Sequence, residues 1–106
     1  MLKEYYLSKS SNLNKKFVVK FINEKTNKVN TIHFGQAGAD DYTITNNDAQ
    51  KVRYKIRHAN DNIFDLSFPG AWSMHLLWNK PSIEASIKDM EKKFGIKIKH
   101  QQDQTQ

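Results

Sequence analysis

The residues whose types and spacing are best suited to binding or catalysis lie in the stretch RYKIRH, residues 53–58. This stretch contains three cationic side chains and a histidine around one tyrosine and one isoleucine. Closely spaced cations can neutralise phosphates, and a tyrosine between them offers a ring on which a base can stack. His58 beside Arg57 could instead serve as a general base. The stretch therefore fits a nucleic-acid-binding surface, a catalytic histidine, or the solvated side of an ordinary helix.

A second candidate for chemistry is the loop GQAGADDYT, residues 35–43, which contains the adjacent carboxylates Asp40 and Asp41. Two carboxylates could hold a magnesium ion for nuclease chemistry. Without further oxygen ligands, however, they make a poor cage for a divalent metal. The loop also lacks the lysine and Ser/Thr ending of a phosphate-binding P-loop. We therefore interpret it as a turn that binds no metal.

Histidine and cysteine patterns give no support for a cofactor. The chain has no cysteine, which excludes disulfides and thiolate zinc sites. No two histidines stand three or four residues apart, the spacing at which one helix presents two metal ligands; they are His33, His58, His75 and His100. We predict no metal, no cofactor and no catalytic residue, and we expect His33 to be a half-buried residue of a strand.

Composition favours one small basic domain. The 106 residues include 17 Lys and Arg against 11 Asp and Glu, a net charge of +6, and the pI is near 9.6. This basicity is typical of nucleic-acid binders, although an excess of lysine also keeps small proteins soluble. Twelve aromatic residues can supply the core of one domain. Neither a signal peptide nor a run of about 20 apolar residues is present, so we expect no secretion and no membrane partner.

Hydrophobic patterning predicts an antiparallel hairpin near the N-terminus. Residues 17–22 and 29–34 are rich in β-branched and aromatic side chains, and the polar run NEKTNK separates them. Residues 1–16 are polar apart from YYL, and we predict an N-terminal arm, with a short strand or an extended segment followed by a loop. We predict that residues 17–99 form a single domain and that residues 100–106 form a polar tail.

A helix is expected to begin between Thr45 and Asp48, with a hydroxyl as its cap and an acid in its first turn. Helical spacing predicts a buried stripe made of Ala49, Val52, Ile56 and Ala59. The basic residues then form two flanks, and Tyr54 points away from the stripe, where it is either exposed or covered by another segment.

Further helices complete an α+β fold. Residues 69–79 fit a helix or a strand, and we favour a helix that Ser67 caps and that stops near Asn79 and Pro81. Residues 83–94 predict an amphipathic helix that ends at Gly95 and buries Ile83, Ile87, Met90 and Phe94. The stretch IKIKH alternates as a strand does. The expected architecture is a hairpin or small antiparallel sheet packed with two to three helices.

Three segments, TIHFGQAGADDYT, KVRYKIRH and GAWSMHLLWNKPSIEASIKDMEKKFG, together resemble a family of small uncharacterised proteins of the nucleocytoplasmic large DNA viruses, or giant viruses. The likeness spans residues 17–94. It implies a viral origin and a conserved fold, and it brings no established activity. Residues 59–69 are acidic and apolar where that family leads us to expect more lysine and arginine. The signature positions are His33, Phe34, Gly35, Gly38, Asp41, Tyr42, Thr43, Arg57, His58, Trp72, Leu77, Trp78, Asn79, Lys80 and Pro81.

Our leading hypothesis is a nonenzymatic viral accessory protein that binds nucleic acid, DNA or RNA, through phosphate contacts. It would act in the host cytoplasm or nucleus, at the viral factory, or in the virion. The candidate residues are Lys51, Arg53, Lys55, Arg57 and His58, with Lys92, Lys93, Lys97 and Lys99 as a second group.

Two other functions stay open at this point. The chain could be a virion component, such as a minor capsid protein, whose hairpin edge, Trp72 and two ends contact other proteins. It could also be a small metal-dependent nuclease that uses Asp40, Asp41 and His58. A purely structural role for the basic stretch, in which Arg57 and His58 tie the helix to the acidic loop, is the remaining interpretation.

Overall fold

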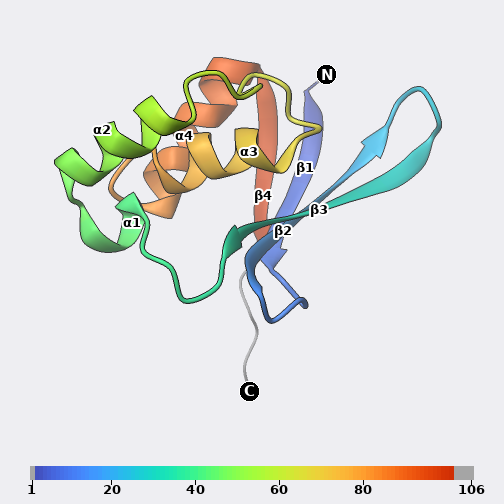
Figure 1. The fold of residues 1–106 in the computed structure, drawn as a ribbon. Coiled ribbons are helices and arrows are strands. Elements are labelled where there is room, and N and C mark those ends of the chain that lie inside the picture. Colours follow the sequence, from blue (N-terminus) through green and yellow to red (C-terminus); the bar gives the residue numbers. More distant parts are fainter. Residues whose placement is uncertain (1, 102–106) are drawn as a thin grey trace.

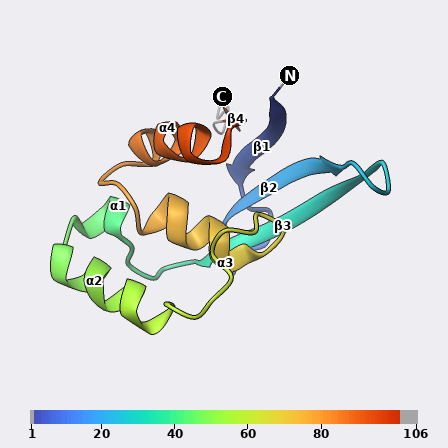
Figure 2. The same cartoon turned by 90° about the horizontal axis from the view of Figure 1, so that it is seen from above.

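A four-stranded mixed sheet forms one layer of the protein, and the helices cover one of its faces (Figures 1 and 2). The computed structural model describes residues 2–101. The strands lie in the order β3-β2-β1-β4, with antiparallel pairing except between β1 and β4, which run parallel. They are β1 Lys3–Lys9, β2 Lys15–Asn23, β3 Lys28–Gln36 and β4 Ile96–Gln101. The predicted α+β class is confirmed.

The β2–β3 hairpin forms where the sequence predicts it. Phe17 pairs with Phe34 and Val19 with Ile32, so alternate apolar side chains of both strands face the helices. Asn27 turns the chain at the tip with a φ of 59°, a left-handed conformation that asparagine tolerates. The tip projects well beyond the helical layer (Figure 1).

Of the two alternatives for the first part of residues 1–16, a short strand or a free arm, the strand is correct. Strand β1 lies inside the sheet between β2 and β4, and both Tyr5 and Leu7 are buried. Its short apolar pattern gave little local signal, and its parallel partner β4 is far away in the sequence. At the other end, His100 and Gln101 continue β4 and do not begin a tail, while residues 102–106 lie outside the described residues.

Five helical segments follow the hairpin: α1 Tyr42–Thr45, α2 Asp48–Arg57, α3 Pro69–Trp72, the π-helical turn η1 Ser73–Leu77, and α4 Ile83–Phe94. The helix predicted over residues 69–79 is confirmed as the continuous α3–η1 segment. Phe68, not Ser67, occupies its N-cap position, and Pro69 starts the first turn. Among the described residues no helix is both long and apolar enough to cross a membrane.

The core lies between the sheet and the α3–η1 and α4 segments. Trp72 is fully buried and contacts the rings of Tyr5 and Phe34. Burial of Trp72 corrects the idea that it contacts other virion proteins. Helix α4 follows its prediction, since Gly95 ends it in a left-handed conformation and Ile87 is buried at 7% exposure. Ser82, which the sequence analysis did not select, caps its N-terminus.

Helix α2 is turned the opposite way from its prediction. Val52 and Ile56, expected in the core, are 55% and 70% exposed. Tyr54 is the residue that packs inward, and its ring stacks on Trp78 with 4.4 Å between centroids and 8° between planes. The cap is Asn47, whose side chain accepts from the Gln50 backbone N–H. The flat face of Trp78 suits an aromatic ring better than two β-branched side chains, which explains the orientation.

Candidate nucleic-acid interface

The nine predicted binding residues fall on three elements and do not form one continuous surface. Helix α2 and its C-cap carry Lys51, Arg53, Lys55, Arg57 and His58, helix α4 carries Lys92 and Lys93, and strand β4 carries Lys97 and Lys99. The two β4 lysines lie on the sheet face that the helices leave uncovered. Lys99 pairs with Glu4 of β1 at 3.4 Å, and Lys97, on the edge strand, lies 4.0 Å from Glu91 of α4.

The structure does bring parts of α2 and α4 together around a cleft of about 230 Å³, which we term the lysine cleft. In Figure 2 the α3–η1 segment lies between the two helices, and it supplies the floor of the cleft. Its polar lining consists of Lys55, His58, His75, Asn79 and Lys93. At the rim, the ring of Phe64 is 68% exposed.

Positive charge accumulates at the lysine cleft. Partial burial lowers the pKa of Lys55, and three neighbouring ammonium groups lower it further, those of Lys51, Lys93 and Lys80. Asp89 is the carboxylate that acts in the opposite direction. Asp89 Oδ2 accepts from the Asn79 side-chain amide at 2.7 Å, and this bond holds the pKa of Asp89 below its usual value. The same Oδ2 atom lies 3.3 Å from Lys93 Nζ.

On α2 and its C-cap, two of the predicted residues are occupied by contacts within the protein. Lys51 Nζ donates to the Asn79 carbonyl oxygen at 2.5 Å and lies 4.6 Å from the ring centroid of Tyr42. His58 Nδ1 is 2.6 Å from an Asp61 carboxylate oxygen, and the His58 ring lies 4.3 Å from the Tyr54 ring. Both side chains hold α2 and its following turn in place beside the cleft.

His75 is a site residue that sequence reasoning did not select. Its side chain is buried beneath the lysine cleft, and burial lowers its pKa. Nε2 lies 2.9 Å from the Ile63 carbonyl oxygen. A carbonyl only accepts, so Nε2 carries the proton and the neutral ring is fixed in one tautomer. The edge-on contact with Phe94, 5.1 Å between centroids, completes its packing. The sequence offered no signal, because His75 has no nearby titratable partner in the chain.

Arg53 and Arg57 lie on the opposite flank of α2 from Lys55, and both are exposed. Among residues 2–101, no carboxylate oxygen lies within 4.0 Å of either guanidinium group. Arg57 lines a second cavity, of about 420 Å³, together with Asp40 and Asp41. The interpretation in which Arg57 ties α2 to the acidic loop by an ion pair is therefore wrong.

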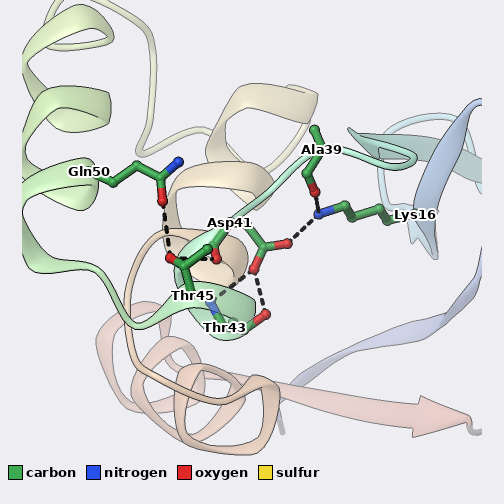
Figure 3. Close-up of polar contacts among 6 residues, drawn as sticks. All are labelled: Lys16, Ala39, Asp41, Thr43, Thr45 and Gln50. Atoms are coloured by element: carbon green, nitrogen blue, oxygen red, sulfur yellow. Dashed lines mark hydrogen bonds and ion pairs between the residues drawn. The ribbon is translucent and has the colours of Figure 1, made fainter.

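The acidic loop is instead fastened to strand β2, as Figure 3 shows. Asp41 is 2% exposed, and one of its oxygens lies 2.5 Å from Lys16 Nζ. The other oxygen accepts from the backbone N–H and the hydroxyl of Thr43, so that Asp41 caps the N-terminus of α1. The hydroxyl of Thr45 then donates to Gln50 Oε1 at 3.0 Å and links α1 to α2.

These contacts leave Asp41 poorly suited to catalysis. Its two oxygens already serve a lysine and a helix cap, while the neighbouring Asp40 is exposed to solvent. Within the part of the chain that the structure describes, no three His, Asp or Glu side chains cluster as metal ligands do. The loop is a structural link between the sheet and the helices.

Fold and site together define a small basic α+β protein with a lysine-lined cleft between two helices. Residues 5–58 match the family described as "Family of unknown function (DUF5754)", and the chain belongs to this family. The matched range begins in β1 and ends at His58, so it contains the α2 side of the lysine cleft but not the α4 side. No curated protein and no solved structure matches the chain.

Proposed function

We propose that the protein is a nonenzymatic nucleic-acid-binding protein that holds phosphates at the lysine cleft. One observation carries the proposal: Lys51, Lys55, Lys80 and Lys93 gather from two helices and the segment before α4, with Asp89 as their acidic neighbour. A viral setting, which the sequence resemblance implies, stays a prediction.

The electrostatics of the cleft favour an anionic ligand. The neighbouring ammonium groups that lower the pKa of Lys55 also repel its charged form, and a phosphate placed among them would offset that repulsion. Lys55 and Lys93 line the cleft itself and would contact the phosphate. Because ammonium groups act as point charges on phosphate oxygens, such contacts would not depend on base sequence.

Two further features fit a nucleic-acid strand. The exposed ring of Phe64 stands at the rim of the cleft, where a base could stack on it. The side-chain amide of Asn79 donates to the Asp89 carboxylate, and its backbone carbonyl accepts from the Lys51 ammonium group. It therefore fixes the positions of both charges around the cleft.

The salt dependence of binding tests this proposal. Each phosphate neutralised on duplex DNA contributes roughly 0.9 to the slope of log affinity against log salt concentration. The double variant Lys55→Gln/Lys93→Gln should therefore flatten the slope by about 2 and weaken binding equally for unrelated sequences. Fluorescence anisotropy with labelled duplex and single-stranded oligonucleotides provides the measurement.

The matched control is Lys25→Gln/Lys28→Gln, which removes the same charge at the β2–β3 hairpin, away from the helical layer (Figure 1). This control should leave the slope within about 0.5 of the wild-type value. Equal slope changes in both double variants would mean that net charge alone drives binding. The lysine cleft would then lose its assigned role.

A further inference from the structure

The outward side of α2 carries an apolar seam that the protein leaves uncovered. Ala49, Val52 and Ile56 recur at intervals of three and four residues, and Ala59 extends the series just past the helix end. This is the a and d spacing of a coiled-coil seam. The two larger side chains, Val52 and Ile56, are more than half exposed.

Helix α2 cannot turn to bury this seam against its own domain. Its inner side is fixed by the stacking of Tyr54 on Trp78 and by the bond from Lys51 to the Asn79 carbonyl oxygen. Rolling the helix would break both contacts. The seam therefore stays available to another molecule, and covering it would gain the free energy of burying two β-branched side chains.

Cationic residues border the seam on both sides. With Ala49 at position a, Arg53 falls at position e and Lys55 at position g, the positions whose charges select the partner helix in a coiled coil. Among the described residues, no carboxylate lies within 4.0 Å of these two side chains. A partner helix would supply the missing negative charges.

We propose that the outward side of α2 binds an amphipathic helix of another protein, one with an apolar a/d seam flanked by Glu or Asp. A second copy of this chain fits less well. Residues 48–57 contain four cations and one carboxylate, so pairing two α2 helices would set like charges against each other. An anionic membrane fits less well too, because small alanines at both ends of the seam suit close helix packing and give little insertion into lipid.

This proposed binding surface is separate from the phosphate site. It lies on the outward side of α2, whereas the lysine cleft lies on the Lys55 flank of the same helix. Lys55 and Ala59 border both surfaces, but Val52 and Ile56 do not line the cleft. Replacing these two residues should therefore leave oligonucleotide binding unchanged. Arg53 and Arg57 belong to the flank away from the cleft, so they can be altered separately from Lys55 and Lys93.

Calorimetry with two designed peptides tests the proposal. Each peptide is a helix of about three heptads with Leu at a and d; one carries Glu at e and g, and the other carries Lys. We expect the Glu peptide to bind the full chain with one-to-one stoichiometry and the Lys peptide to bind at least about tenfold more weakly. Val52→Gln/Ile56→Gln should lower affinity for the Glu peptide by at least about tenfold.

The control variant is Val29→Gln, which alters a valine on β3 that is 60% exposed and should leave peptide binding unchanged. Thermal melts of all variants verify that they fold. Equal binding of the two peptides, or full binding by Val52→Gln/Ile56→Gln, overturns the proposal. A dimer seen by light scattering that Ile56→Gln abolishes also overturns it, since the seam would then bind a second copy of the chain. Flotation with phosphatidylglycerol vesicles that Ile56→Gln abolishes overturns it as well, since the seam would then bind a membrane.

Discussion

Helices α2 and α4 both have an amphipathic sequence, yet only α4 packs with its apolar stripe in the core. In α4, Ile87 and Met90 are buried against the sheet layer. In α2, Val52 and Ile56 face outward while Tyr54 packs inward. The apolar periodicity is similar in the two segments, so periodicity alone does not determine which side of a helix a domain covers.

The neighbours of each helix explain the difference. Helix α4 leads directly into β4, the edge strand that pairs with β1, and its stripe meets an apolar surface of the core. Helix α2 rests on Trp78 and on the polar backbone that follows η1, where a tyrosine ring and a lysine amine find partners. The stripe left out of the core is the surface that we propose binds another molecule.

The largest expected difference between the helices is in stability. Ile87→Ala should lower the free energy of unfolding by about 2–5 kcal/mol, because it leaves a cavity in the core. The same change at Ile56 should cost less than about 0.5 kcal/mol, because that side chain already contacts water. Urea denaturation of the two variants provides the comparison. Similar losses at both positions would show that α2 is packed as the sequence pattern suggests.

The inward side of α2 provides an intermediate effect. Tyr54→Leu removes the ring stacked on Trp78 but keeps an apolar side chain, so a loss of about 0.5–1.5 kcal/mol is expected. The near-ultraviolet circular dichroism of Trp78 should change with it. If Tyr54→Leu proves neutral while Ile56→Leu alters stability, the orientation of α2 described above is wrong.

The smallest effect concerns pH and the floor of the lysine cleft. Burial lowers the pKa of His75, so the unfolded chain binds a proton that the folded protein excludes. Stability from this residue is complete above about pH 6.5 and falls as the pH drops toward the lower pKa of the folded state. Melting temperatures at about pH 7.5 and 5.5 should therefore differ less in His75→Gln than in the wild type. An unchanged difference would remove His75 as the cause.

Local patterns predicted those parts of the fold that local interactions determine. The hairpin has alternation across a short polar turn, and α4 has a glycine stop and an apolar stripe that meets the core. Local pattern did not decide between a strand and a free arm for β1, because this strand depends on its parallel pairing with β4, a contact between distant parts of the chain. The side of α2 that packs inward depended in the same way on a distant residue, Trp78.

The candidate site was predicted in part for the same reason. Clustered cations in the sequence pointed to α2, and Lys55 and Lys93 were both among the predicted residues. The position of η1 between α2 and α4 brings Lys55 and Lys93 together around one cleft and buries His75 beneath it. The same arrangement places Lys80 close enough to add to the positive charge of the cleft. No spacing rule within either helix contains that information.

The most direct test of phosphate binding at the lysine cleft is an NMR titration of the Lys55 ammonium group. Without ligand, the pKa of Lys55 should lie below the ordinary lysine value because of burial and of the three neighbouring lysines. Adding a short oligothymidylate should raise this pKa, since phosphate favours the charged form, and should leave hairpin lysines such as Lys28 unaffected. A Lys55 pKa that does not respond while the oligonucleotide binds elsewhere would contradict the proposal.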